Sequence, residues 1–238
     1  QAYLRKAVAS ALSRAPLHEV LPPELQPPHG PSLRAALQFL HHPDASVSAE
    51  ALEDHSHPAW QRLKYEELLA QQASQLQARW ERARLKAPAL PSRVGGLQER
   101  LLAVLPFTLT EAQRRVVEEI AQDMARPSPM HRLLQGDVGS GKTVVAALAA
   151  AVAMEAGWQC ALMAPTEILA EQHFRKLVSW LEPLGIRVAW LTGSLKSKVK
   201  KAQLEAVATG EAQLVVGTHA VIQDQVEFKK LGLALIDE

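Results

Sequence analysis

Residues 136–143 have the sequence Gly136-Asp137-Val138-Gly139-Ser140-Gly141-Lys142-Thr143, which fits the pattern G-x-x-x-x-G-K-[ST] of a phosphate-binding P-loop. In such a loop the glycines let backbone N–H groups close around phosphate oxygens, and the following helix adds the positive end of its dipole. Lys142 is expected to contact the β- and γ-phosphates, and the Thr143 hydroxyl is expected to bind Mg²⁺. The pattern therefore predicts a nucleotide-binding site.

The segments on both sides of this loop support that prediction. The run Met130–Leu134 before it is interpreted as a short buried strand. Residues Val144–Ala156 after it are rich in alanine and contain neither glycine nor proline, which predicts a helix. The alternative is a turn rich in Gly and Ser that precedes Lys-Thr by chance. The order strand, glycine loop and helix favours the P-loop.

Composition limits the classes of protein to consider. The chain has 238 residues, enough for one or two domains with a real core. Its 26 basic and 25 acidic residues nearly balance, so a nucleic-acid site would have to be a local patch. One candidate patch is the lysine cluster, Lys196, Lys198, Lys200 and Lys201, for which a solvated helix face is the alternative interpretation.

The single cysteine and the hydropathy pattern bear on the cellular compartment in which the protein is expected. Cys160 cannot form an intramolecular disulfide, which points to a reducing environment. The sequence contains no apolar run of membrane-spanning length and no signal-peptide pattern at its start. It begins without Met and stops directly after an apolar run, so we expect both ends to be cut.

The first part of the chain is predicted to be helical and rich in loops. Helices are expected at Tyr3–Ala15 and Ser32–His41, separated by several prolines. One long helix is expected from Pro58 to Lys86, followed by a short one at Leu97–Val104. Six histidines in residues 1–57 match no zinc spacing and are interpreted as surface residues: His18, His29, His41, His42, His55 and His57.

This organisation predicts three parts. Residues 1–57 form a mostly helical and loop-rich region, residues 58–105 a linker of one long and one short helix, and residues 106–238 the nucleotide-binding lobe. Within the lobe, a helix is expected from Thr110 to about Ala125. Gln113 has capping-box spacing from Thr110, so it either closes the start of the helix or uses its amide to recognise adenine. The residues alone leave these alternatives open.

After the P-loop the sequence alternates between strand and helix patterns. Helices are expected at Thr166–Leu181 and Leu195–Ala208. The expected strands are Gln159–Ala164, Val188–Leu191, Leu214–Val216 and Leu231–Ile236. Strands separated by helices predict an α/β fold in which a parallel sheet is flanked by helices.

Polar or glycine-bearing segments follow every predicted strand. They are the P-loop, Pro165-Thr166-Glu167, Thr192-Gly193-Ser194, Gly217-Thr218-His219 and Asp237-Glu238. Because ligand sites of such sheets lie at the carboxyl ends of the strands, these segments predict one continuous functional surface. Asp237-Glu238 after an apolar strand is a Walker B pattern, in which one carboxylate can hold Mg²⁺ through water, complementing Thr143, and its neighbour could orient the attacking water.

The order of these motifs resembles the superfamily 2 DNA helicases, and more narrowly the RecG family of ATP-dependent translocases that remodel branched DNA. The stretches that carry the resemblance are Leu21–Leu25, His57–Ala59, Gln61–Leu63, Leu105–Phe107, Gln113, 136–143, Ala164–His173, Leu191–Gly193, Val216–Ala220 and Asp237–Glu238. The resemblance implies a RecA-like lobe preceded by the end of a DNA-binding wedge region. It also implies ATP and Mg²⁺ as cofactors, and stalled forks or Holliday junctions as the DNA.

The resemblance also implies roles for individual residues. Gln113 and Phe107 would bind the adenine base, and Lys142 and Glu238 would be the catalytic residues. Asp237 would join Thr143 in holding Mg²⁺. The DNA backbone would be contacted by Thr166, Gly193, Thr218 and His219, a positioning role rather than base recognition.

The family's motor has two lobes with ATP between them, and this sequence contains the motifs of the first lobe only. We therefore expect a second lobe in the same full-length protein, a monomer of the bacterial cytosol associated with the nucleoid. By itself the chain is expected to bind ATP–Mg²⁺ but barely to hydrolyse it. Two alternatives are a P-loop ATPase of another class, and a module that binds DNA or a partner without turnover.

Overall fold

The structure is a computed structural model that describes residues 2–27, 30–44 and 47–237. The chain divides into two compact units, Gln1–Glu81 and Arg82–Glu238. The three-part division predicted from the sequence concerns functional regions and stays a prediction.

The first unit is helical. Its elements are α1 (Ala2–Arg14), a 3₁₀ turn (Pro23–Leu25), α2 (Leu33–His41), α3 (Ala49–Glu53) and most of α4 (Pro58–Ala83). The Ser32 hydroxyl accepts the Ala35 N–H at the start of α2, a normal N-cap. The long helix predicted from Pro58 ends at Ala83, three residues before the expected Lys86.

Arg62 of α4 is the centre of a buried ion pair in this unit. Its side chain is 2% exposed and donates to Glu19 at 2.5 Å and to Glu66 at 2.6 Å. Glu19 also accepts the Leu33 N–H at the start of α2. One arginine therefore links the loop after α1 and the start of α2 to the long helix, because a buried guanidinium needs carboxylate partners.

The second unit contains the predicted lobe. Its helices are α5 (Leu97–Val104), α6 (Glu111–Met124), α7 (Lys142–Glu155), α8 (Glu167–Leu181) and α9 (Ser197–Thr209). Its strands are β1 (Gln159–Met163), β2 (Val188–Leu191), β3 (Leu214–Gly217) and β4 (Leu231–Ile236). Short 3₁₀ turns follow α8 at Glu182–Leu184 and β3 at His219–Ile222.

The four described strands form one parallel sheet in the order β2-β3-β1-β4. The sequence prediction of a parallel α/β sheet flanked by helices is confirmed. All four strands run the same way, so their carboxyl ends meet at a single edge. The segments predicted to be functional follow β1, β2, β3 and β4 at this edge.

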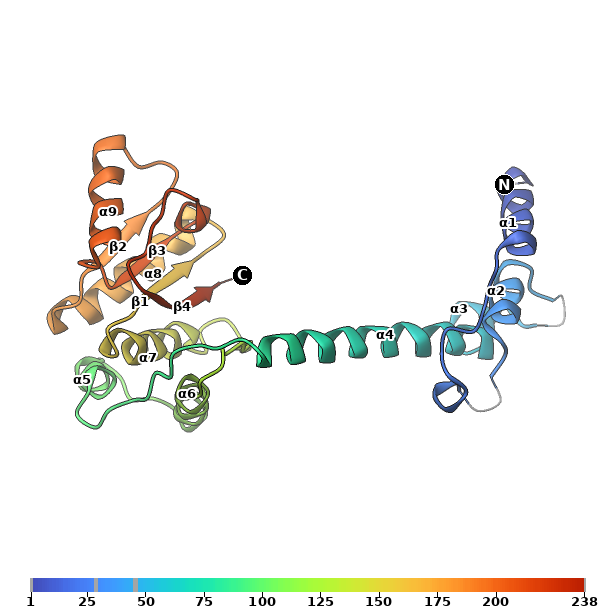
Figure 1. The fold of residues 1–238 in the computed structure, drawn as a ribbon, viewed down its shortest axis with the longest axis horizontal. Helices are drawn as coiled ribbons and strands as arrows, with labels where there is room; N and C mark the ends of the chain where they lie inside the picture. Colours follow the sequence, from blue (N-terminus) through green and yellow to red (C-terminus); the bar gives the residue numbers. More distant parts are fainter. Residues whose placement is uncertain (1, 28–29, 45–46, 238) are drawn as a thin grey trace. The chain divides into compact units, whose positions relative to one another are not determined.

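Helices cover both faces of this sheet, as Figure 1 shows. Cys160 and Val216 pack on one face with α7 and α8, while Ala161 and Val215 pack on the other with α9. Helices α5 and α6 lie on the outer side of α7. Ten residues of α7 are buried, which explains its lack of a polar face.

The predicted strand at Met130–Leu134 is wrong. These residues have no strand pairing in the structure, and Leu133 is 78% exposed. His131 and Arg132 interrupt the apolar run on which the prediction was based. The Arg132 guanidinium donates to Asp123 and Glu119 of α6, both at 2.7 Å, so this segment is held to α6 rather than to β4. These hydrogen bonds raise the pKa of Arg132.

Two buried polar side chains lie in the core for structural reasons. The Cys160 thiol faces the Ala150 carbonyl, and burial raises its pKa, so it is a core residue and not a nucleophile. Gln159 is 4% exposed and its amide donates to the carbonyls of Val207 and Ala212 while accepting the Lys230 N–H. This amide therefore joins β1 to the end of α9 and to the start of β4.

Gln159→Leu is expected to destabilise the second unit by about 3 kcal/mol, because the buried Ala212 carbonyl and the Lys230 N–H lose their hydrogen-bond partner, while the Val207 carbonyl keeps only the Gly210 N–H. The midpoint of thermal unfolding should fall by about 6–12 °C, given the size of the unit. Calorimetry measures this, with Gln172→Leu on the exposed side of α8 as the matched control. Equal midpoints for the two variants would contradict the assigned role.

No helix in the described part of the chain is long and apolar enough to cross a membrane.

Candidate nucleotide site and strand-end surface

The P-loop, residues 136–143, connects the segment at 130–134 to α7, and its shape depends on glycine. Gly139 and Gly141 have φ angles of +83° and +85°, which only glycine adopts at low cost. The Ser140 N–H donates to the Asp137 carbonyl at 3.1 Å and closes a tight turn. Lys142 is the first residue of α7, so the helix N-terminus points into the loop. This is the geometry of an anion-binding site.

Lys142 lies against the loop that precedes it. Its ammonium group donates to the carbonyl of Gly136 at 2.6 Å and to that of Asp137 at 3.0 Å. The same positive charge lies at the start of α7, where the helix dipole also favours an anion. Both features match the predicted phosphate-binding role of Lys142, which stays a prediction together with those of Gly136, Asp137, Val138, Gly139, Ser140 and Gly141.

Gln113 connects the start of α6 to the P-loop. Its amide oxygen accepts the Thr110 N–H at 2.9 Å and the Thr110 hydroxyl accepts the Gln113 N–H, so the predicted capping box is present. The amide nitrogen donates to the Ser140 carbonyl at 2.8 Å. A Cβ at position 141 would lie 2.3 Å from that nitrogen, a second reason for glycine there. Adenine recognition by Gln113 stays a prediction.

Phe107, the other predicted adenine contact, lies before α6. Its ring is 44% exposed and meets the edge of Trp180 of α8 with ring centres 6.1 Å apart. Part of the ring therefore remains accessible, as a stacking role requires. Its role toward the base stays a prediction.

Asp237 and Thr143 are connected by a histidine. Asp237 follows β4 and its N–H donates to the Met163 carbonyl at 2.8 Å, which continues the pairing with β1. The His173 Nε2 lies 2.7 Å from the Asp237 carboxylate, and Nδ1 lies 3.5 Å from the Thr143 hydroxyl. The two predicted Mg²⁺ ligands thus lie on either side of one imidazole. Glu238, predicted to activate water, lies outside the described residues.

His173 has no role among the residues predicted from the sequence. It lies inside Ala164–His173, one of the stretches that carry the family resemblance, but 64 residues separate it from Asp237. Only the folded chain brings α8, the P-loop and the end of β4 together. The only signal in the sequence was that a histidine lies within such a stretch. That signal does not indicate that His173 contacts Asp237 and Thr143.

The donor set fits Mg²⁺ bound together with a nucleotide. Thr143 and Asp237 offer hard oxygen ligands, and the described residues contain no group of three or more His, Cys, Asp or Glu side chains that would form an all-protein metal cage. Mg²⁺ is typically held by one or two carboxylates together with phosphate oxygens. This pair of oxygens beside a P-loop matches that arrangement.

The remaining strand ends form the predicted DNA-contacting surface. Thr166 caps α8, its hydroxyl accepting the Leu169 N–H, and Gly193 follows β2; both are exposed. Glu167 of α8 accepts from the backbone N–H of Ser194 at 3.3 Å and from its hydroxyl at 2.9 Å. A carboxylate therefore ties the end of β1 to the end of β2, and DNA binding there stays a prediction.

The end of β3 lies between these two. A Cβ on Gly217 would lie 1.7 Å from the Leu191 carbonyl oxygen, so the two strand ends meet in a close backbone approach. The Thr218 N–H donates to the same carbonyl at 3.2 Å. Thr218 is half-buried and His219 is exposed. The DNA role predicted for these two residues also stays a prediction.

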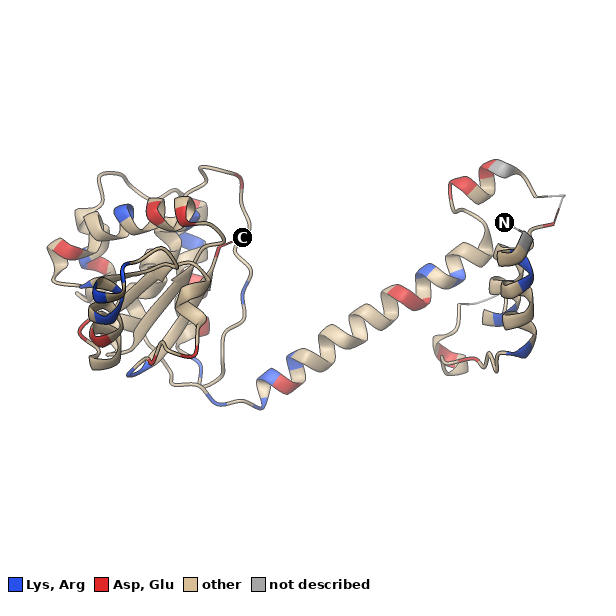
Figure 2. Ribbon diagram, turned by 90° about the horizontal axis from the view of Figure 1, so that it is seen from above, with Lys and Arg blue, Asp and Glu red and all other residues tan. Residues whose placement is uncertain are grey.

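The lysine cluster lies at the start of α9, immediately after the Thr192–Ser194 segment. Lys196, Lys198 and Lys201 are exposed and Lys200 is half-buried. Figure 2 shows basic and acidic residues interspersed over the second unit, in keeping with the nearly neutral composition. The cluster is a local concentration of positive charge next to the strand-end surface, and its contact with DNA stays a hypothesis.

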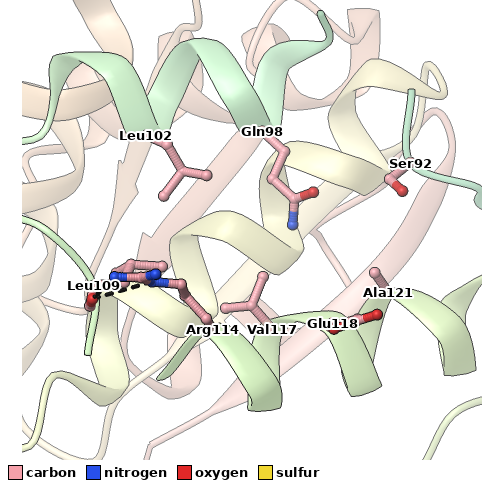
Figure 3. A pocket seen from close by; sticks show the side chains of 8 residues that line it. All are labelled: Ser92, Gln98, Leu102, Leu109, Arg114, Val117, Glu118 and Ala121. Carbon is pink, nitrogen blue, oxygen red and sulfur yellow. Dashed lines mark hydrogen bonds between the residues drawn. The ribbon is translucent and has the colours of Figure 1, made fainter. Parts of the chain in front are cut away.

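A separate hollow of about 250 Å³ lies between α5 and α6. Figure 3 shows Gln98 and Leu102 of α5 facing Arg114 and Val117 of α6 across it. The Arg114 guanidinium donates to the Leu109 carbonyl at 3.0 Å, just before α6 begins. These contacts fix the start of α6 and therefore the position of Gln113. The residues around the hollow thus support the candidate nucleotide site from outside it.

The fold and the loop define a P-loop nucleotide-binding lobe with a parallel sheet. The comparison with known proteins narrows this class: residues 110–238 match the model of the DEAD/DEAH box helicase family. The chain belongs to the DEAD/DEAH box helicase family. The predicted membership in the helicases is confirmed.

Individual relatives are similar over the whole chain. The ATP-dependent DNA helicase RecG of Pasteurella multocida is 51% identical over 238 residues, and that of Escherichia coli K12 is 50% identical over 241. These matches cover 99% and 100% of this chain and 34% of each relative, so the chain spans about a third of their length. A solved structure of RecG bound to a three-way DNA junction matches with a TM-score of 0.76 and 40% identity, covering 100% of this chain and 32% of that one.

Proposed function

We propose that this chain is the first, nucleotide-binding lobe of an ATP-dependent DNA helicase that acts on branched DNA such as stalled forks and Holliday junctions. ATP would bind at residues 136–143, and Thr143 and Asp237 would hold Mg²⁺. Lys142 stabilises the transferred phosphoryl group, and Glu238 orients the attacking water. A second lobe of the same longer protein closes the site from the other side.

The observation that supports this proposal is the arrangement of the sheet edge. His173 of α8 brings Asp237 and Thr143 into one place. The same helix is capped by Thr166, and its first residue, Glu167, accepts a hydrogen bond from Ser194, the residue after Gly193. One element thus touches both the nucleotide site and the predicted DNA path, as coupling of ATP hydrolysis to movement on DNA requires. The RecG relatives named above support branched DNA as the substrate.

Mg²⁺ supplies Lewis-acid stabilisation of phosphate charge when it is bound. The chain's own residues do the remaining work. The backbone N–H groups of 136–143 and the start of α7 hold the phosphates, and Gln113 and Phe107 orient the base. Thr166, Gly193, Thr218 and His219 hold the DNA backbone. We further propose a monomer that works in the bacterial cytoplasm on the nucleoid.

The proposal is tested with the longer protein that carries this chain, by measuring ATP hydrolysis with no DNA, with linear duplex and with a three-way junction. We expect the junction to stimulate hydrolysis most and to be unwound with ATP but not without it. Hydrolysis that ignores DNA altogether would favour a P-loop ATPase of another class. Mg²⁺-independent DNA binding without any hydrolysis would favour a pure binding module.

A further inference from the structure

His173 makes polar contacts through both ring nitrogens. It is 15% exposed, and it faces two segments that are far apart in the sequence, the start of α7 and the residue after β4. Any buried imidazole needs a partner for each ring nitrogen. What distinguishes His173 is that its two partners are Thr143 and Asp237, the two predicted Mg²⁺ ligands.

The chemistry of the partners fixes the direction of the hydrogen bonds. An ionised carboxylate only accepts, so Nε2 carries the proton and donates to Asp237 across 2.7 Å. In the neutral ring Nδ1 is then an acceptor, and the Thr143 hydroxyl donates toward it across 3.5 Å. The first bond is short and the second is at the outer limit of hydrogen-bond distance, so the Asp237 bond has the larger effect.

We propose that His173 is a positioning residue for the Mg²⁺ site, which orients the Asp237 carboxylate and the Thr143 hydroxyl so that their free oxygen lone pairs face the same cation. The proposal rests on the proposed nucleotide site. With Nε2–H bound to one carboxylate oxygen, the other oxygen of Asp237 stays available. A threonine hydroxyl that donates its proton to Nδ1 likewise keeps its lone pairs for the metal.

The effect of such hydrogen-bond partners on metal affinity has a typical size. Groups that hydrogen-bond to the ligands, without touching the metal, typically change metal affinity by 10- to 100-fold when they are removed. His173 contacts both ligands at once from the rigid middle of α8. The ring therefore sets the relative placement of two ligands that lie far apart in the sequence, one at the start of α7 and one directly after β4.

The position of His173 on α8 extends the inference to the DNA surface. The helix is capped by Thr166, and its first residue Glu167 binds Ser194 at the end of β2. His173 lies two turns further along the same helix. Any shift of α8 caused by contact at its N-terminus would move the imidazole relative to Asp237, and this would change Mg²⁺ binding.

The test measures binding of N-methylanthraniloyl-ADP to this chain by fluorescence, in EDTA and across a Mg²⁺ titration. For His173→Ala we expect unchanged nucleotide affinity in EDTA and a Mg²⁺ concentration at half-maximal effect that rises by about 10- to 100-fold. His173→Gln places an amide near the position of Nε2 and should restore most of the Mg²⁺ affinity. Gln172→Ala, at an exposed neighbouring position on α8, is the matched control and should behave like the unsubstituted chain.

A second measurement observes the His173 ring directly and does not use the fluorescent nucleotide. Mn²⁺ in place of Mg²⁺ should broaden the ring ¹⁵N signals of His173 in the nucleotide-bound chain, since both of its partners are ligands. Thermal unfolding without metal or nucleotide shows that each variant is folded.

The outcomes separate the two proposals. If the unsubstituted chain shows no Mg²⁺-dependent nucleotide binding, the nucleotide site itself is wrong. If it binds normally but folded His173→Ala has the same Mg²⁺ dependence, only the positioning role is overturned. Equal losses in EDTA and in Mg²⁺, or a Gln variant no better than Ala, would assign His173 a purely structural role and also overturn the inference.

Discussion

The 238 residues of this chain, taken by themselves, are expected to hydrolyse ATP about 10³- to 10⁵-fold more slowly than a complete helicase of the family, because an arginine from a partner lobe contributes that much to phosphoryl transfer. The chain provides a P-loop, a lysine and two oxygen ligands from one lobe only. We expect these groups to bind ATP–Mg²⁺ with an affinity that can be measured.

The measurement compares single-turnover ATP hydrolysis by this chain with that by full-length Escherichia coli RecG, each with and without three-way junction DNA. Fluorescent-nucleotide titration of the same sample shows that the chain is folded and occupied. DNA-stimulated turnover by the chain alone, abolished by Lys142→Ala, would contradict the prediction and would mean that one lobe holds a complete active site.

Local sequence signals predicted most of the fold because they act over a few residues. The Thr110–Gln113 capping box and the bounds of β2 are set by nearby residues. The helix after the P-loop was also predicted, although α7 begins at Lys142, two residues before the expected Val144. Parallel pairing followed from the alternation of strands with helices. The polar segments after β1, β2, β3 and β4 meet at one edge because the strands are parallel.

The errors arose where distant partners decide the structure. Whether 130–134 becomes a strand depends on a neighbouring strand that offers backbone groups, and here Arg132 is bound to acidic residues of α6 instead. The Mg²⁺ ligand pair was predicted from two motifs, but the imidazole between Thr143 and Asp237 was not. Contacts between α8 and the end of β4 depend on how both pack on the sheet, which no short pattern records.

Lys142→Ala is expected to have the largest effect of any single substitution in this chain. A hydrogen bond to a charged phosphate contributes about 1.5–3 kcal/mol, so the Kd of this chain for ATP–Mg²⁺ should rise about 10- to 100-fold. In the longer protein, loss of a cation that stabilises developing charge should lower the rate of ATP hydrolysis by about 10²- to 10³-fold.

The contacts of Lys142 decide which control variants are needed for this substitution. Lys142 also donates to the carbonyls of Gly136 and Asp137. Lys142→Ala therefore removes two hydrogen bonds that hold the P-loop as well as the positive charge. Lys142→Arg keeps the charge but carries a planar guanidinium that fits this tight loop less well, and it should recover binding more than hydrolysis. Lys176→Ala, at an exposed position on α8, removes an equal charge elsewhere and should leave both quantities unchanged. If Lys142→Ala hydrolysed ATP at a normal rate, the phosphates would have to bind elsewhere, and the functional assignment of the whole sheet edge would fail with it.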